Sequence, residues 1–121
     1  MESQTKVIDL TFLEGFTKGN TDKMVYFINM YLKTAPNLFN ELLNFSIEKN
    51  WEGVYSKAHT LKPQVHYVGI VGLKDLLVNI EQIAKEGGDK DSLTELVFEA
   101  VKLNNEGISE LENFITTNSY Q

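Results

Sequence analysis

Apolar residues recur at intervals of three and four along nearly the whole chain. These intervals place them on one face of an α-helix, because the helix makes one turn in about 3.6 residues. No segment alternates apolar and polar residues between turn signals, as a half-buried strand would. The pattern therefore predicts an all-α fold.

The places where this spacing starts and stops divide the chain into five helices joined by short connections. Their predicted ranges are 10–16, 21–47, 51–68, 71–86 and 92 to the C-terminus. Short connections make consecutive helices antiparallel neighbours. We therefore expect an up-down-up-down antiparallel four-helix bundle with a short extra N-terminal helix. The length of 121 residues suits a single domain over 1–121.

A few residues are expected to shape the ends and bends of these helices. Asn50 is a suitable N-cap for the third helix. Gly87-Gly88 can take left-handed positions that end the fourth helix. Ser92 and Glu95 have the spacing of a capping box at the start of the fifth helix. Pro36 should kink the second helix, because proline has no N–H to donate.

Composition narrows the environment and the partners. The chain has no cysteine, which excludes disulfides and thiolate metal sites and fits a cytoplasmic protein. It has neither a run of about 18 apolar residues nor a secretory signal, so no membrane association is expected. The net charge is −6 and arginine is absent, which disfavours binding to nucleic acid. We expect an acidic cytoplasmic domain that meets other proteins, and a buried stripe on each helix favours a monomer.

Common enzyme and metal motifs are missing. There is no glycine-rich phosphate loop with a lysine, and no serine in a nucleophile elbow. Di-iron bundles need Glu-x-x-His, but Ser56 and Pro63 stand three residues before His59 and His66. The two histidines are seven residues apart rather than four, so no metal site and no cofactor is predicted.

His59 is the residue most open to chemistry. At about 100° per residue, its direction misses the mean direction of the apolar stripe on its helix by roughly 130°. We therefore expect His59 to point to solvent or to a partner, with Ser56, Pro63 and His66 on the same side. Lys62 follows at i+3, close enough to reach a group carried by His59.

This pair suits a phosphoryl carrier. The ordinary pKa of histidine is about 6.5, so a neutral imidazole offers a nitrogen lone pair in the cytoplasm. The phosphoryl group brings nearly two negative charges, which a lysine can offset. Such transfer asks the protein mainly for positioning and charge stabilisation. The same pair also arises by chance on many surface helices, so its spacing alone does not assign a function.

The sequence resembles the histidine-containing phosphotransfer (HPt) family of two-component phosphorelays over nearly its whole length. The resemblance is carried first by the run Ala58-His59-Thr60-Leu61-Lys62. Further matching positions are Ala35-Pro36, Asn50-Trp51, Gly69, Leu73, Leu76-Leu77, Ile80-Glu81 and Gly87-Gly88-Asp89. Their order and spacing, in a chain of matching length, are what make the resemblance specific.

The resemblance implies roles for three residues. His59 would be the phospho-acceptor and Lys62 its charge partner. Glu81 falls where the family often has a glutamine or glutamate that faces the acceptor. Its alternative is a surface i,i+4 pair with Lys85, worth about 0.3–0.5 kcal/mol, and the two interpretations stay open.

The chain departs from the family after the lysine, where glycine and small residues usually follow. It has Pro63-Gln64-Val65 instead. We expect a kinked or locally opened turn at Pro63. Ser56, Pro63 and His66 would then contribute to the surface on which a partner docks, although an ordinary surface residue is the favoured interpretation of His66.

The leading hypothesis is a phosphorelay intermediate that is not itself an enzyme. A receiver domain of a response regulator or hybrid histidine kinase would pass a phosphoryl group from its aspartate to His59. His59 would pass the group on to another receiver, reversibly. The alternative is a non-catalytic protein-interaction bundle that has lost phosphotransfer, which Pro63 and Gln64 favour. A metal-binding or nucleic-acid-binding bundle is the third possibility and is disfavoured.

Overall fold

The computed structural model describes residues 7–86 and 90–118. Its elements, in chain order, are α1 (Thr11–Phe16), α2 (Thr21–Ile47), α3 (Trp51–Val68), α4 (Leu73–Glu86), the 3-10 turn η1 (Lys90–Ser92) and α5 (Leu93–Asn118). The described ranges contain no strand, only an isolated antiparallel bridge between Ile8 and Ile70. The predicted all-α class is confirmed. The glycine pair expected to end the fourth helix, Gly87-Gly88, lies outside the described residues.

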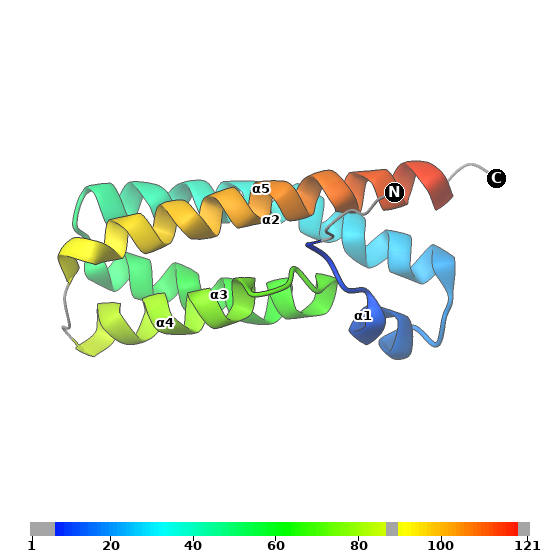
Figure 1. The fold of residues 1–121 in the computed structure, drawn as a ribbon, viewed down its shortest axis with the longest axis horizontal. Coiled ribbons are helices and arrows are strands. Elements are labelled where there is room, and N and C mark those ends of the chain that lie inside the picture. The colour runs from blue at the N-terminus through cyan, green and yellow to red at the C-terminus, as the bar shows by residue number, and fades with distance from the viewer. Residues whose placement is uncertain (1–6, 87–89, 119–121) are drawn as a thin grey trace.

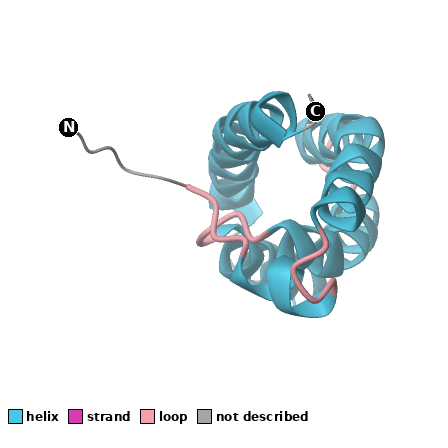
Figure 2. Cartoon of the chain, turned by 90° about the vertical axis from the view of Figure 1, so that its right-hand side faces the viewer, coloured by secondary structure: helices cyan, strands magenta, loops and turns pink. Residues whose placement is uncertain are grey.

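The four long helices lie alongside one another (Figure 1). α2 packs against α3 and α5, and α4 packs against α3 and α5, so the packing closes into a ring. The view from one end shows the helices arranged around a shared interior (Figure 2). Apolar side chains fill this core, and its largest fully buried members are Leu13, Ile28, Leu42, Val54, Leu61, Val65, Val68, Leu73, Leu77, Ile80, Leu93 and Leu111.

Local capping explains where the helices start and stop. The side chain of Asn20 accepts a hydrogen bond from the Lys23 N–H at the start of α2 (3.0 Å). Asn50 does the same for the Gly53 N–H at the start of α3 (3.0 Å), so its predicted N-cap role is confirmed. α3 ends at Val68, and the residue that follows, Gly69, has a left-handed backbone. The two asparagine contacts satisfy N–H groups that the first turn of a helix leaves without partners.

The fourth helix starts two residues later than predicted. It begins at Leu73 rather than at Val71. Gly72 has a φ of +84°, which an α-helix cannot contain. The Val71 N–H is bonded to the Val7 carbonyl instead (2.7 Å), in the short N-terminal segment that crosses this turn.

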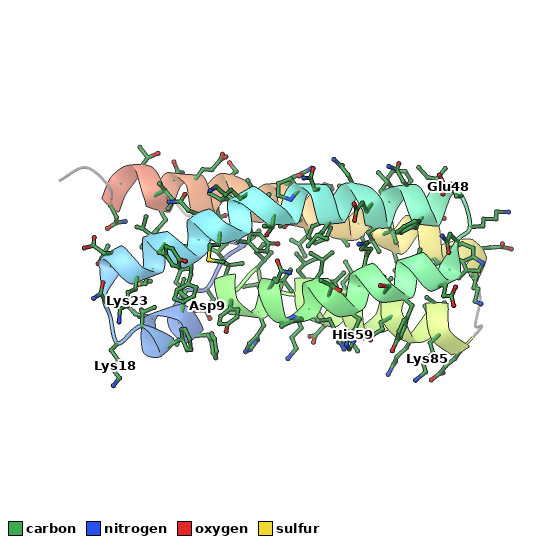
Figure 3. All side chains as sticks on the ribbon, turned by 180° about the vertical axis from the view of Figure 1, so that it is seen from behind. Asp9, Lys18, Lys23, Glu48, His59 and Lys85 are labelled. Carbon is green, nitrogen blue, oxygen red and sulfur yellow. The ribbon has the colours of Figure 1, made fainter. Side chains whose placement is uncertain are left out.

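Both internal prolines lie within continuous helices. Pro36 is inside α2 and Pro63 is inside α3. The N-terminal part of α2 (blue) slopes relative to the rest of the helix (cyan), so the helix changes direction along its length (Figure 3). At Pro63 the expected opening of the turn is absent and α3 stays helical, because the buried Leu61 and Val65 anchor the turns on either side to the core.

Two polar contacts join helices across the core. The Tyr31 hydroxyl on α2 donates to the Asn104 side-chain oxygen on α5 (2.5 Å), and both residues are buried. Burial raises the pKa of Tyr31, so the phenol keeps its proton as a donor. Ser46 on α2 also donates to Thr94 on α5 (2.9 Å). Pairing is needed because a buried polar group without a partner is costly.

The segment before α1 is bound to the turn between α3 and α4. The Asp9 N–H donates to the Gly69 carbonyl (2.8 Å). On α5, the Glu110 carboxylate accepts from the backbone N–H groups of Val7 (2.9 Å) and Ile8 (3.2 Å). These bonds hold an irregular segment against α5 and against the turn between α3 and α4.

The close approach of the Asp9 backbone to Gly69 can be tested by adding a single methyl group, as in Gly69→Ala. Gly69 has a φ of +68°, and a Cβ there would lie 1.9 Å from the Asp9 carbonyl oxygen. We expect Gly69→Ala to lower the free energy of unfolding by about 2 kcal/mol or more, from the left-handed backbone and the clash together. Urea unfolding followed by circular dichroism measures the change.

Gly15→Ala is the matched control, because nothing lies within 4 Å of a Cβ at that position of α1. It should leave the protein unchanged or stabilise it by up to about 1 kcal/mol. Equal stability of the two variants would contradict the tight fit at Gly69.

Candidate functional site

The candidate site lies where α3 faces α4 on the outside of the molecule. His59 lies on the side of α3 that faces away from α2 (Figure 3). Its side chain is 63% exposed, as the helical period predicts. Ala58 and Leu61, its neighbours on the apolar stripe, are fully buried and fix the rotation of the helix. The histidine is thus an exposed group on a rigid support.

Glu81 on α4 joins His59 and Lys62. Its Oε2 lies 2.8 Å from the Nδ1 of His59, and its Oε1 lies 2.5 Å from the Nζ of Lys62. The carboxylate is only 10% exposed. The surface pair with Lys85 is therefore the wrong interpretation of this residue: the carboxylate points to α3 rather than to solvent.

The charge state of Glu81 follows from these contacts. Burial alone would raise the pKa of the carboxyl group. The hydrogen bonds from Lys62 and His59, together with the positive charges of Lys62 and of a protonated His59 ring, outweigh burial and hold the pKa of Glu81 below the usual value of 4.5. Glu81 is therefore an ionised carboxylate near neutral pH.

An ionised Glu81 decides which nitrogen of His59 is free. A carboxylate accepts hydrogen bonds and cannot donate one, so the Nδ1 of His59 must carry the proton in this contact. In the neutral imidazole this leaves the lone pair on Nε2. The ring nitrogen that remains open to a partner is therefore Nε2.

Lys62 has a different immediate partner from the one expected. The sequence placed it within reach of a group on His59, and its ammonium is bonded to Glu81 in the unmodified protein. Its side chain is 26% exposed, so the ammonium remains accessible from solvent. A second anion beside His59 can therefore share this lysine with Glu81.

The aromatic ring of Tyr55 is a neighbour of His59 that sequence reasoning missed. Tyr55 lies one turn earlier on α3, and the two rings are nearly parallel (14°) with centroids 6.0 Å apart. The i,i+4 spacing of an aromatic residue and a histidine was the signal that could have found it.

The three residues expected at a docking surface do not form one cluster. Ser56, Pro63 and His66 are all exposed on α3. The ring of His66 packs against Phe12 of α1, with centroids 4.5 Å apart. Seven residues of helix separate it from His59 by about 10 Å along the axis. His66 is therefore part of the contact with α1 rather than part of the site at His59.

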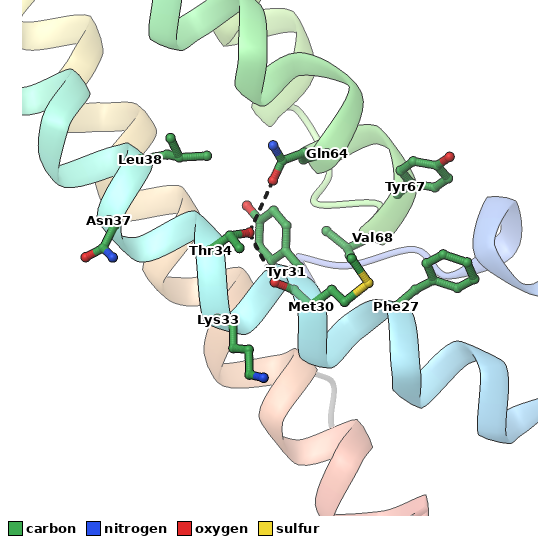
Figure 4. Close-up of a pocket in the computed structure, with 10 residues that line it drawn as sticks. All are labelled: Phe27, Met30, Tyr31, Lys33, Thr34, Asn37, Leu38, Gln64, Tyr67 and Val68. Carbon is green, nitrogen blue, oxygen red and sulfur yellow. Dashed lines mark hydrogen bonds between the residues drawn. The ribbon is translucent and has the colours of Figure 1, made fainter.

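An apolar groove of about 700 Å³ opens between α2 and α3 (Figure 4). The Thr34 hydroxyl and the Gln64 side chain lie 3.5 Å apart across it. Its lining residues are Phe27, Met30, Tyr31, Lys33, Thr34, Asn37, Leu38, Gln64, Tyr67 and Val68. None of them is His59, Lys62 or Glu81, so the groove is separate from the contacts of His59.

Other kinds of site find little support in the described ranges. No three histidine, cysteine, aspartate or glutamate residues among them are grouped so that they could hold a metal ion. None of the helices in the described part of the chain combines the length and apolarity of a membrane-spanning segment.

Comparison of the chain with family models, curated proteins and solved structures gave no match. A role for His59 therefore rests on the chemistry of its surroundings and on the motif resemblance.

The contacts of Glu81 predict a pH dependence of stability. A carboxylate with a depressed folded-state pKa stabilises the fold above its usual pKa of 4.5, and the stabilisation is lost as the pH falls through the lower folded value. Glu81→Gln cannot titrate. Between about pH 6 and about pH 3 it should therefore lose less free energy of unfolding than the wild type. Urea unfolding at the two pH values measures this, and identical losses would contradict the pairing.

Proposed function

We propose that this chain is a phosphorelay intermediate of the histidine-containing phosphotransfer type. His59 would accept a phosphoryl group from the phospho-aspartate of a receiver domain and pass it to the aspartate of another receiver. The helices would form an up-down-up-down antiparallel four-helix bundle, an interpretation supported by the closed packing of α2, α3, α4 and α5. The carrier would act as a cytoplasmic monomer and would have no kinase activity of its own.

The observation that carries the proposal is the exposed imidazole whose Nδ1 is bonded to a buried carboxylate. The Nε2 lone pair of His59 would attack phosphorus while the bond from phosphorus to the aspartyl oxygen breaks, and its electron pair returns to the donor carboxylate. The ring keeps the Nδ1 proton and becomes positively charged. The Glu81 carboxylate, 2.8 Å away, then stabilises a charge that develops only during transfer.

Lys62 would neutralise the phosphoryl oxygens. In the unmodified protein its ammonium is held by Glu81, which keeps it beside the site at little further cost in side-chain entropy. The incoming group carries up to two negative charges, so the lysine would be shared between phosphoryl and carboxylate. Positioning and charge are what phosphoryl transfer requires of a protein.

Docking would use the exposed face of α3 around His59. Ser56 lies one turn before the histidine and Pro63 one turn after it, and both are exposed. The partners would be receiver domains of response regulators or hybrid histidine kinases. An exposed helix face suits a partner that must bring its aspartate to within bonding distance of Nε2.

Substitution of each histidine separates the acceptor from an ordinary surface residue. Incubation with a radiolabelled phospho-receiver should label the wild type and His66→Gln. It should not label His59→Gln, which has lost the nucleophilic nitrogen. The label should be acid-labile and stable to base, as expected for phosphohistidine. Labelling of His59→Gln to the wild-type level would refute the assignment.

Removal of the lysine tests the charge role. Lys62→Ala should slow phosphoryl transfer by about tenfold to a hundredfold, because one charge-assisted contact to the phosphoryl group is lost. Single-turnover transfer from a phospho-receiver gives the rate, and circular dichroism checks that the helices remain. Lys57→Ala is the matched control, since Lys57 lies on the same helix and pairs with Glu41 instead (2.9 Å). Equal rates in the two variants would contradict the role of Lys62.

A second candidate function is a protein-interaction bundle without phosphotransfer. The apolar groove between α2 and α3 favours it, because a groove with apolar walls and a polar rim can bind the apolar face of a partner helix. In that case binding of the protein partner would survive His59→Gln, and a phospho-receiver would label neither the wild type nor the variant.

A further inference from the structure

The hydrogen bond to Glu81 does not by itself fix the ring of His59. One bond at Nδ1 holds one atom, and the side chain is 63% exposed. The side chain can still rotate about χ1 and χ2 together while Nδ1 stays within hydrogen-bond distance of the carboxylate. The Nε2 lone pair lies in the plane of the ring, so such a rotation swings it away from an incoming phosphorus atom. A second contact is needed to set the plane.

Tyr55 provides a flat surface at the required place. Helical side chains lean toward the N-terminal end of their helix, so His59 leans over the turn that carries Tyr55. The two ring planes differ by only 14° and the centroids are 6.0 Å apart, an offset parallel arrangement. Tyr55 is half-buried and packs against the core cluster, so its own ring is anchored.

We infer that Tyr55 is a positioning residue for His59, which sets the plane of the imidazole while Glu81 sets its Nδ1 end. The inference rests on the proposed phosphoryl transfer and adds to it the residue that aims Nε2. Two constraints from two helices, one at an edge and one at a face, leave a single orientation of the ring. No step of the reaction passes through Tyr55: the bond from Nε2 to phosphorus forms as the aspartyl oxygen leaves, and the phenol neither gives nor takes a proton.

Three substitutions at this position separate a flat face from mere packing. Tyr55→Phe keeps the ring and removes only the hydroxyl. Tyr55→Leu keeps an apolar side chain against the core but has no flat face, and Tyr55→Ala removes both. Tyr26→Leu is the matched control, because Tyr26 is 61% exposed on α2 and its ring contacts Phe27 rather than His59.

The first measurement is the single-turnover rate of phosphoryl transfer from a phospho-receiver at a saturating concentration of carrier. We expect Tyr55→Phe and Tyr26→Leu to match the wild type. Tyr55→Leu and Tyr55→Ala should be slower by about two- to tenfold, the loss expected for one aromatic pair. Circular dichroism and urea unfolding show which variants keep the fold.

The second measurement needs no phosphoryl donor. Three-bond NMR couplings of His59 in the unmodified protein report its χ1 rotamer populations, which should be dominated by one rotamer in the wild type and in Tyr55→Phe. Tyr55→Leu should populate more than one. A purely structural role of Tyr55 would leave the rotamers of a folded Tyr55→Leu variant unchanged.

The outcomes distinguish this inference from the function on which it rests. If wild type and Tyr55→Leu transfer at equal rates and show the same rotamers, the positioning role is overturned while phosphotransfer stands. If the wild type accepts no phosphoryl group, the proposed function fails and the role of Tyr55 in transfer fails with it. The inference is supported if Tyr55→Leu transfers more slowly and populates several His59 rotamers, while Tyr55→Phe matches the wild type in both measurements.

Discussion

Each long helix of this protein has to bury one apolar face, and the fold depends on that constraint more than on any single bond. The fully buried residues come from all four long helices and from α1. Burial at about 25 cal/mol per Å² of apolar surface is the main term that opposes the loss of chain entropy. It also fixes how each helix is rotated. Because Ala58 and Leu61 face inward, His59 must face outward.

The candidate site depends on how α3 and α4 are rotated, because this brings Glu81 next to His59 and Lys62. Glu81 is a carboxylate in a nearly buried position, and such a group needs partners because desolvated charge is expensive. Lys62 and His59 supply those partners from the neighbouring helix. The contact that stabilises the buried charge also fixes the tautomer of the exposed histidine. The same interaction therefore joins α3 to α4 and leaves the lone pair of His59 on Nε2.

Periodicity and local signals predicted the helices and much of the site. The all-α class, the N-cap at Asn50 and the exposure of His59 follow from residue types and spacing within a few turns of chain. The contacts that were not predicted join distant segments. Glu81 was left open between two partners because sequence spacing cannot say whether its side chain turns toward α3 or toward solvent.

The same limit applies to other residues. Nothing in the spacing pairs Tyr31 with Asn104, 73 residues away. Gly107 inside α5 is buried, and a Cβ there would lie 2.7 Å from the Ile70 side chain. Its small size lets α5 approach the turn between α3 and α4, a reason that exists only in three dimensions.

Pro63 gives the site a feature on the backbone as well. Proline has no N–H, so the carbonyl oxygen of His59 lacks the i+4 donor that an uninterrupted ladder of helical bonds would provide. The residue proposed to carry phosphate thus has a main-chain acceptor without its usual helical donor. A glycine or alanine at position 63 would restore an N–H that donates the usual helical hydrogen bond to this carbonyl.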